Sequence, residues 1–285
     1  MSNLAGIGKT GRTRLSKVLE QNPGTIRASD VAKLLNLPLK EASRILSRWC
    51  ANGWLYRVKR GIYIPIPMDS TSSEILIEEP FVIADSIYHP GYVAGFSAIK
   101  HWDLSEQIIE TVYYFTTKQV KKRNPVYGST RFQIKTIAEN RLFGTKTIWY
   151  GSKKVKVSDP AKTVVDILND PKLVGGMSVV DDVFKNYLET KHCNFKALID
   201  YAGRMNNKTI LKRLGFLVDV KLDEVPTELS EIDKLISSGY SNFDPMVEGK
   251  YIVEKWKLKV PASWKKEYLT ERHLADLKSP LSLKN

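Results

Sequence analysis

The sequence predicts an α+β protein in which a small domain of three helices and a β-hairpin precedes a larger domain of mixed strands and helices. Three observations lead to this prediction. A length of 285 residues corresponds to about two domains. Residues 1–68 hold 12 Lys and Arg against 3 Asp and Glu, whereas residues 69–285 hold 32 against 28, so most of the net charge of +13 lies in the first quarter. Apolar residues recur with a helical period up to residue 51, and β-favouring residues follow.

The first domain, predicted at residues 1–68, begins with three helices. The first covers residues 13–21 and stops before a Pro-Gly pair. A short extended stretch at 25–26 follows, and Ser29 is expected to cap the second helix, which is about two turns long. The third helix begins at Pro38, where the missing N–H costs nothing, and ends before Asn52-Gly53.

The third helix separates apolar side chains from basic ones. Its apolar side holds Ala42, Ile45, Leu46 and Trp49. On the opposite side, Lys40, Arg44 and Arg48 form a stripe at positions i, i+4 and i+8. Like charges at this spacing repel one another, so the stripe favours a polyanionic partner over a purely structural role.

A β-hairpin follows the third helix. Residues 54–58 and 62–64 favour strands, and Arg60-Gly61 between them is a turn signal. Three helices followed by such a hairpin make a winged helix-turn-helix, in which the third helix enters the major groove and the wing contacts the DNA backbone. The candidate DNA-binding residues are Arg27, Lys40, Ser43, Arg44, Ser47, Arg48, Arg57, Lys59 and Arg60. Among them, Arg44 and Arg48 are suited to guanine edges, and the other cations of the helix and wing to phosphates.

A polar, acidic stretch at residues 69–80 is the predicted linker, and residues 81–285 form the second domain. Strands are expected over 80–85, 111–117, 131–137 and 145–151, and a helix over 94–102. Asp159 caps a helix that starts at Pro160, and the helical period continues over 176–188, 195–205, 208–217 and 228–236. The alternating segment 251–260 is expected to rejoin the sheet as a strand.

Several functional classes lack support in the sequence. The two cysteines, Cys50 and Cys193, lie far apart, and the four histidines form no HxxxH or HExxH pair, so we expect neither a metal nor a cofactor. There is no signal-peptide core and no apolar run long enough to cross a bilayer, so we expect a cytoplasmic protein without a membrane partner.

Two alternatives remain open beside DNA recognition. Asp244, Glu248 and Lys250, and separately the Asp219-Val220-Lys221 triplet, resemble half of a metal-dependent nuclease site, which would make the chain a DNA-targeted nuclease. Short matches of this kind are common in chains rich in Lys and Glu. The winged helix could instead be a protein-interaction module, which would show no salt-sensitive DNA affinity.

Five segments resemble the AbiEi-type antitoxins of bacterial type IV toxin–antitoxin systems, which act in phage defence by abortive infection. The segment "LSRWCANGWLYRVKRGIYIP" resembles the end of that family's winged helix, and "YVAGFSAIKHWDLSEQ" the start of its antitoxin domain. The central and closing segments that resemble the family are "VSDPAKTVVDILNDPKLVGG", "LKRLGFLVD" and "FDPMVEGKYIVEKWKLKV".

This resemblance implies a regulator rather than an enzyme. The first domain would bind operator repeats in double-stranded DNA and repress its own operon. The second domain would counteract a nucleotidyltransferase-like toxin, a functional partner that need not be a direct contact. Because a single winged helix covers little DNA, we also expect two copies on an inverted repeat.

Overall fold

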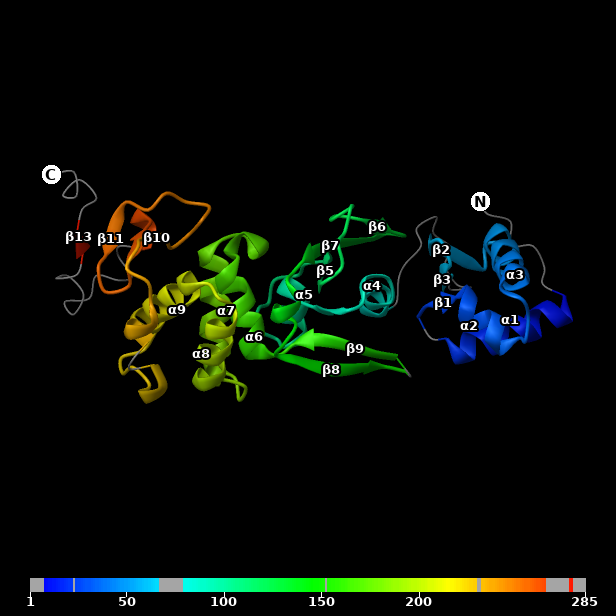
Figure 1. The fold of residues 1–285 in the computed structure, drawn as a ribbon, viewed down its shortest axis with the longest axis horizontal. Coiled ribbons are helices and arrows are strands. Elements are labelled where there is room, and N and C mark those ends of the chain that lie inside the picture. The colour runs from blue at the N-terminus through cyan, green and yellow to red at the C-terminus, as the bar shows by residue number, and fades with distance from the viewer. Residues whose placement is uncertain are drawn as a thin grey trace. The chain divides into compact units, whose positions relative to one another are not determined.

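The computed structural model describes residues 8–22, 24–66, 79–151, 153–229, 232–264 and 277–278, the last pair as backbone only. The chain forms two compact units, whose helices and strands are labelled in Figure 1. Unit 1 comprises Met1–Val93, Ile109–Ile137 and Lys146–Val157, and unit 2 comprises Ala94–Ile108, Ala138–Thr145 and Ser158–Asn285. Most of the predicted linker lies outside the described residues, and the predicted domain boundaries stay a prediction.

Unit 1 begins with a winged helix-turn-helix, as the sequence predicts. Its elements in order are α1 (Lys9–Gln21), β1 (Ile26–Arg27), α2 (Ala28–Leu34), α3 (Leu39–Ala51), β2 (Leu55–Lys59) and β3 (Ile62–Pro65). The three strands form a small sheet in the order β1-β3-β2, with both pairs antiparallel. Strand β3 of the wing is therefore paired along both of its edges, with β1 on one and β2 on the other.

The prediction that Ser29 caps the second helix was wrong. The residue at the N-cap is Arg27, whose side chain makes no capping hydrogen bond. Ser29 lies in the first turn, and its hydroxyl donates to Asp30 Oδ1 at 3.2 Å. The helix starts earlier because β1 pairs with β3, and the amide of Ala28 continues this contact by donating to the carbonyl of Gly61 at 3.2 Å.

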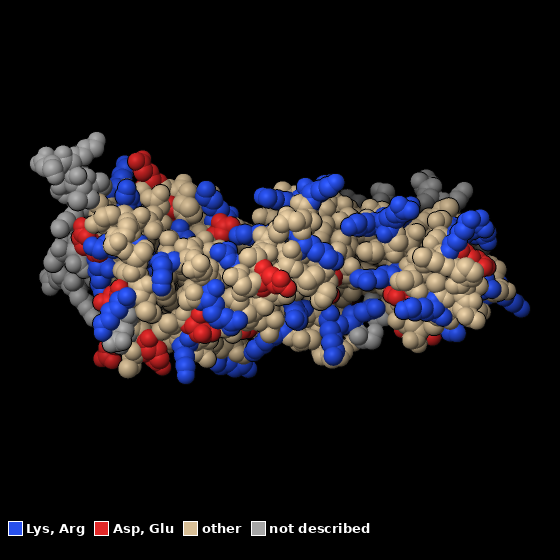
Figure 2. Space-filling view, viewed as in Figure 1, with Lys and Arg blue, Asp and Glu red and all other residues tan. Residues whose placement is uncertain are grey.

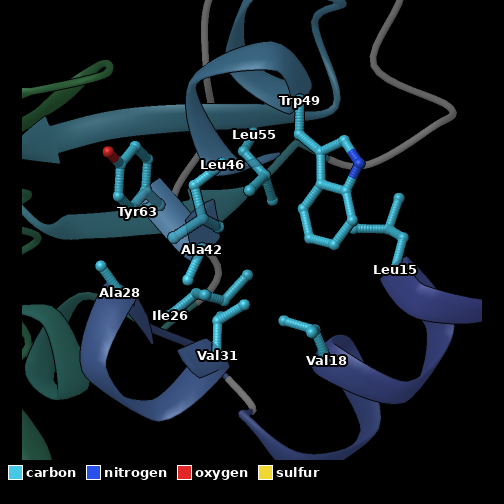
Figure 3. Packing of buried hydrophobic residues seen from close by; sticks show 10 residues of the cluster. All are labelled: Leu15, Val18, Ile26, Ala28, Val31, Ala42, Leu46, Trp49, Leu55 and Tyr63. Carbon is cyan, nitrogen blue, oxygen red and sulfur yellow. The ribbon is translucent and has the colours of Figure 1, made fainter. Parts of the chain in front are cut away.

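The buried face of α3 holds this helix against the rest of the winged helix. Leu46 is fully buried and Trp49 is 3% exposed, and both belong to one buried cluster that includes Val18 of α1 and Val31 of α2 (Figure 3). Burial of one such side chain contributes about 1.5–3 kcal/mol. The opposite face of α3 is thereby fixed toward solvent.

The remainder of unit 1 is built on a six-stranded mixed sheet. Its strands are β4 (Gly91–Val93), β5 (Val112–Thr116), β6 (Val126–Tyr127), β7 (Thr130–Thr136), β8 (Thr145–Tyr150) and β9 (Lys153–Ser158), in the order β6-β7-β5-β4-β9-β8. β5 runs parallel to β7 and antiparallel to β4, and β4 runs parallel to β9. The carboxyl ends of β5 and β7 and the amino ends of β4 and β9 therefore share one end of the sheet.

The prediction of a strand over residues 80–85 was wrong, because this segment is the start of helix α4 (Pro80–Tyr88). A short apolar run does not distinguish a buried strand from a buried helix. Pro80 fits the first turn of a helix, and Val82, Ile83 and Ile87 are buried. The helix is joined to the sheet by the hydroxyl of Tyr114, which donates to Asp85 Oδ1 at 2.7 Å.

Unit 2 is mainly helical. Its α-helices are α5 (Gly95–His101), α6 (Pro160–Asn169), α7 (Met177–Glu189), α8 (Phe195–Arg204) and α9 (Lys208–Lys221), with short 3-10 helices at Glu139–Arg141, Pro171–Val174 and Ala262–Trp264. α6 is the central helix, and its Val164, Val165 and Leu168 are fully buried. The predicted cap is confirmed, since Asp159 Oδ1 accepts the amide of Lys162 at 2.8 Å.

The last part of the described chain differs from the prediction. Residues 228–236 were expected to form one helix, but the described residues there form two 3-10 helices, Thr227–Leu229 and Ile232–Leu235. Segment 251–260 does not rejoin the first sheet. It folds back as β11 (Tyr251–Val253) and β12 (Leu258–Val260) in a separate sheet of order β10-β12-β11-β13, completed by β10 (Ser241–Asn242) and β13 (Leu277–Lys278).

No helix within the described residues combines the length and the apolar character needed to span a membrane.

Candidate nucleic-acid interface

The solvent face of α3 carries the predicted basic stripe. Lys40, Arg44 and Arg48 are all exposed, whereas Ala42, Leu46 and Trp49 on the other face are buried. Within the described part of the chain, none of the three cations forms an ion pair. Three like charges on one face without a neutralising partner raise the free energy of the isolated protein, and an anionic polymer would lower it.

The wing presents a second group of cations. Arg57, Lys59 and Arg60 are exposed at the end of the β2–β3 hairpin, where Gly61 adopts a positive φ of 79°. Arg57 and Lys59 face solvent while Val58 between them is buried, and the pairing register shifts between Arg57 and Lys59. A β-bulge of this kind re-aims side chains at the end of a hairpin.

Helix and wing meet at a groove of about 880 Å³. Leu39, Ser43 and Ser47 line it from α3, and Arg57 and Arg60 line it from the wing. A smaller depression is lined by Leu39, Lys40, Ser43, Arg44 and Ser47 along α3. Arg27 also lines the larger groove, so seven of the nine candidate residues line one or both of these depressions. The other two, Arg48 and Lys59, are exposed outside them.

Arg27 has a contact that the sequence did not predict. Its Nη2 donates to the main-chain oxygen of Ser86 in α4 at 2.7 Å, and Thr25 Oγ1 lies 2.8 Å from Ser86 Oγ. One side of its guanidinium is therefore used within the protein. A guanidinium has five N–H donors, so others remain for a ligand in the groove.

Leu39 is a groove residue that sequence reasoning missed. It lies at the start of α3 and is 58% exposed, which is unusual for a leucine in the first turn of a packed helix. Its position one turn before Ala42 predicts a buried side chain, so the hydrophobic period did not indicate that Leu39 would be exposed in the groove. The core ends before this turn of the helix, and the side chain is left beside Lys40 and Ser43 in the smaller depression.

Burial also affects one thiol beneath the interface. It raises the pKa of Cys50, and the charge of Arg57 partly opposes this effect. The thiol therefore stays protonated near neutral pH.

The carboxylate at the centre of the first nuclease alternative has a structural role instead. Asp244 is buried, and its two oxygens accept the amides of Met177 at 2.9 Å and Met246 at 2.8 Å, while Glu248 and Lys250 are exposed. This bonding makes Asp244 a cap for α7. Nothing in this arrangement favours nuclease chemistry.

The second nuclease triplet also has structural partners. Asp219 accepts hydrogen bonds from Lys255 Nζ at 2.7 Å and Trp256 Nε1 at 2.6 Å, and Lys221 pairs with Asp181 at 2.6 Å. Among the described residues, no three His, Cys, Asp or Glu side chains are grouped so that they could hold a metal ion.

Comparisons with known proteins bear on both parts of the chain. The fold is similar to the crystal structure of the RV2827C protein from Mycobacterium tuberculosis, with a TM-score of 0.60 and 15% identity over 91% of this chain and 94% of that one. At this identity the likeness shows a shared fold. A comparison with curated proteins finds no match. Residues 14–66 match the family described as "Transcriptional regulator, AbiEi antitoxin", so the resemblance to AbiEi-type antitoxins is confirmed and is carried by the winged helix.

Proposed function

We propose that this chain is a sequence-specific DNA-binding repressor of the operon that encodes it, and the antitoxin of a type IV toxin–antitoxin system in phage defence. The observation that carries the proposal is the exposed basic face of α3, which lies beside a basic wing without ion-pair partners among the described residues. The match of residues 14–66 to a family of transcriptional regulators supports it.

The residues of this face divide into two roles. Arg44 and Arg48 project from α3 and are suited to bidentate hydrogen bonds with guanine in the major groove, each contributing about 1–3 kcal/mol of discrimination. The remaining cations, Lys40, Arg57, Lys59 and Arg60, neutralise phosphates and fix the orientation of the helix. Ser43 and Ser47 line the groove between these groups and donate to bases or phosphates.

The antitoxin part of the proposal rests on the family. The second region counteracts a nucleotidyltransferase-like toxin, with or without direct contact, and the chain itself is not an enzyme. Two copies bind an inverted repeat, because one winged helix buries only a small DNA surface. The protein acts in the cytoplasm, where both its promoter and a toxin would be found.

The test is binding of the full chain to the DNA immediately upstream of its own gene, compared with a scrambled duplex of the same composition, by fluorescence anisotropy over a series of salt concentrations. We expect the wild type to prefer the upstream duplex and to lose affinity steeply with salt. Arg44→Ala/Arg48→Ala should abolish the preference. Arg14→Ala/Lys17→Ala is the matched control, because it removes two exposed cations from α1 and should leave the preference intact.

Equal, weak binding of the wild type to both duplexes would contradict the repressor. Undiminished preference in the Arg44→Ala/Arg48→Ala variant would contradict the assigned residues while leaving DNA binding in place. For the antitoxin, growth of cells that express the neighbouring toxin gene should be rescued by the wild-type chain, and failure of rescue would contradict that part.

A further inference from the structure

Strand β8 is an open edge of the six-stranded sheet. Among the described residues, β9 is its one strand neighbour, so β8 forms a border of the sheet (Figure 1). None of the turn and loop hydrogen bonds of the described backbone involves Thr147, Ile148 or Trp149. An edge strand presents unpaired N–H and C=O groups along its outer side, and these groups can pair with another strand.

The two edges of this sheet differ in their protection. The other edge, β6, has two residues and follows directly after Pro125, so it offers little backbone for pairing. β8 has six residues without a proline, and Lys146 is its one charged residue. It therefore lacks most of the features that prevent an edge strand from pairing.

Trp149 adds a large apolar surface to the β8 edge. Its side chain is 61% exposed, and the ammonium of Lys154 in β9 lies 4.6 Å from its ring centre. The neighbouring Tyr150 packs edge to face with Phe81 of α4, with the ring centres 6.1 Å apart. The end of β8 is thus held in place by α4, while most of the Trp149 side chain faces solvent.

A second copy of β8 matches this edge under one symmetry. Two identical edge strands can pair antiparallel about a two-fold axis perpendicular to the sheet, and each side chain then meets one from the same face. Lys146, Ile148 and Tyr150 share one face of β8, and Thr147 and Trp149 share the other. One residue must therefore lie on the axis, opposite its own copy.

Length and charge favour Ile148 on that axis. An axis at Ile148 pairs residues 146–150 of each strand, whereas an axis at Trp149 pairs only residues 148–150. With Thr147 on the axis, the two copies of Lys146 lie diagonally across the interface and repel one another. With Ile148 on the axis, Lys146 lies opposite Tyr150 of the other copy. Trp149 then lies opposite Thr147, and a pair of an aromatic and a β-branched residue is favourable.

We infer that two copies of this chain pair through β8, with Ile148 on a two-fold axis, and join their sheets into one. The choice of a second copy as the occupant rests on the proposed binding of two copies to an inverted repeat, because the symmetry of such a site mirrors that of the bound protein. Pairing through β8 uses the open edge of both copies, so assembly stops at a dimer.

The dimer is weak in solution. Five paired residues on each side bury less than the roughly 1,200 Å² at which stable interfaces begin. Residues 145–158 of the β8–β9 hairpin also hold four lysines and no acidic residue, and blue side chains predominate over these strands in Figure 2. Two such hairpins repel one another, so dilution separates the copies and added salt strengthens the dimer.

Disulfide trapping of the full chain without DNA tests the position of the axis. Both native cysteines are replaced by Cys50→Ala and Cys193→Ala, and one new cysteine is introduced as Ile148→Cys or Thr147→Cys. Cα atoms of directly opposite residues lie about 4.5–5.5 Å apart, within the range of a disulfide, whereas diagonal neighbours lie about 7–8 Å apart, beyond that range.

We expect Ile148→Cys to form a disulfide-linked dimer under mild oxidation and Thr147→Cys to remain monomeric. Random collisions would give the opposite preference, because Thr147 is exposed and Ile148 is half-buried. The two variants differ by one position on the same strand, so each serves as the matched control of the other.

Sedimentation velocity without DNA tests the uncrosslinked dimer. We expect the wild type to self-associate between about 10 µM and 1 mM, and more tightly at about 0.5 M salt than at about 0.05 M. Trp149→Lys removes both aromatic pairs and adds a like charge, so it should weaken association at least about tenfold. Val126→Lys is the matched control, because it makes the same charge change at a 53% exposed residue of the other edge and should leave association unchanged.

A wild type that stays monomeric over this range would overturn the inference, as would a trapped dimer of Thr147→Cys in place of Ile148→Cys. Equal effects of Trp149→Lys and Val126→Lys would do the same. Binding of an acidic, strand-forming peptide to a wild type that stays monomeric would assign the edge to another protein. Failure of the proposed function is distinct, because none of the dimer measurements contains DNA.

Discussion

The Nη2 atom of Arg27 donates a hydrogen bond of 2.7 Å to the main-chain oxygen of Ser86, which links the strand before α2 to α4. The same serine hydroxyl lies 2.8 Å from Thr25 Oγ1. Two residues of the winged helix thus contact one residue of α4. Since Arg27 also lines the groove, its side chain has both a structural contact and a position suited to DNA.

The two roles of Arg27 can be separated by substitution. Arg27→Ala should speed amide hydrogen exchange near Ser86 in α4 and lower the free energy of unfolding by about 1 kcal/mol, a small value because the arginine is exposed. Arg27→Lys should restore DNA affinity through its charge but not the protection of α4, because lysine lacks the planar donor fork. Hydrogen-exchange mass spectrometry measures the first effect. Unchanged exchange in both variants would show that the contact does not hold α4.

Leu39 should recognise a thymine methyl group. Its exposed side chain borders the depression along α3, and apolar side chains contact this methyl group in the major groove. Replacing the contacted thymine by uracil removes one methyl group, worth about 0.8 kcal/mol or a fourfold loss of affinity in the wild type. Leu39→Ala should be insensitive to this replacement, whereas Leu39→Met should respond. Anisotropy with a set of single thymine-to-uracil duplexes measures the effect, and an equal response of Leu39→Ala and wild type would refute the contact.

Arg213 should be essential for the stability of unit 2. From α9 it donates to the carbonyl oxygens of Leu168 at 2.6 Å, Phe243 at 2.9 Å and Asn242 at 3.1 Å. Lysine cannot reach three acceptors in this geometry, so Arg213→Lys should lower the free energy of unfolding by at least about 2 kcal/mol.

Urea denaturation measures this loss. The matched control is Lys208→Arg, the reverse exchange at the exposed start of the same helix, which should change stability by less than about 0.5 kcal/mol. A similar small change in Arg213→Lys would mean that its three hydrogen bonds contribute little.

His101 should make stability depend on pH. Burial lowers the pKa of this imidazole in the folded state, and the carboxylate of Asp103 partly opposes the effect. The unfolded chain therefore binds a proton at higher pH than the folded one. The contribution to stability is complete above the unfolded pKa of about 6.5 and is lost as the pH falls toward the folded pKa.

Urea denaturation at a series of pH values between about 7.5 and 5 checks this prediction. Carboxylates also titrate at the acid end, so the informative quantity is the difference between wild type and His101→Gln. The free energy of unfolding should fall more steeply for the wild type. Parallel curves would show that His101 has the same pKa in both states.

The winged helix could be predicted from the sequence because its signals are local. The apolar period around Leu46 and Trp49 sets the buried face of α3, and the Arg60-Gly61 turn sets the wing. Both features depend on residues a few positions apart. The same holds for the Asp159 cap of α6.

The larger region was less predictable because its signals depend on distant partners. Residues 80–85 have the composition of a buried strand, but they form a helix because the sheet beside them leaves a face for α4 to cover. Segment 251–260 alternates as a strand does, yet it turns back at Lys257, which has a positive φ of 50°. No local pattern specified which sheet it would join.

The basic strands of unit 1 were not predicted for a related reason. A sum over residues 69–285 averages residues 111–138 and 145–158, which hold ten Lys and Arg and no Asp or Glu, with the acidic segment before α4 and with the balanced charges of the helices. Folding separates these groups in space, so Lys118 lines the same groove as Arg57 although 60 residues of chain lie between them. Counted by compact unit, unit 1 holds 22 Lys and Arg against 9 Asp and Glu, whereas unit 2 holds 22 against 22.

The path of the chain limits how the protein can be dissected. The backbone passes between the two units five times, at residues 93–94, 108–109, 137–138, 145–146 and 157–158. A fragment that ends after the wing keeps every strand of its own sheet, but one that ends between β4 and β9 leaves the six-stranded sheet with missing members and exposed edges. Loss of activity on truncation at such a point would report an unfinished sheet, so the division of labour between regions is better resolved by point substitutions.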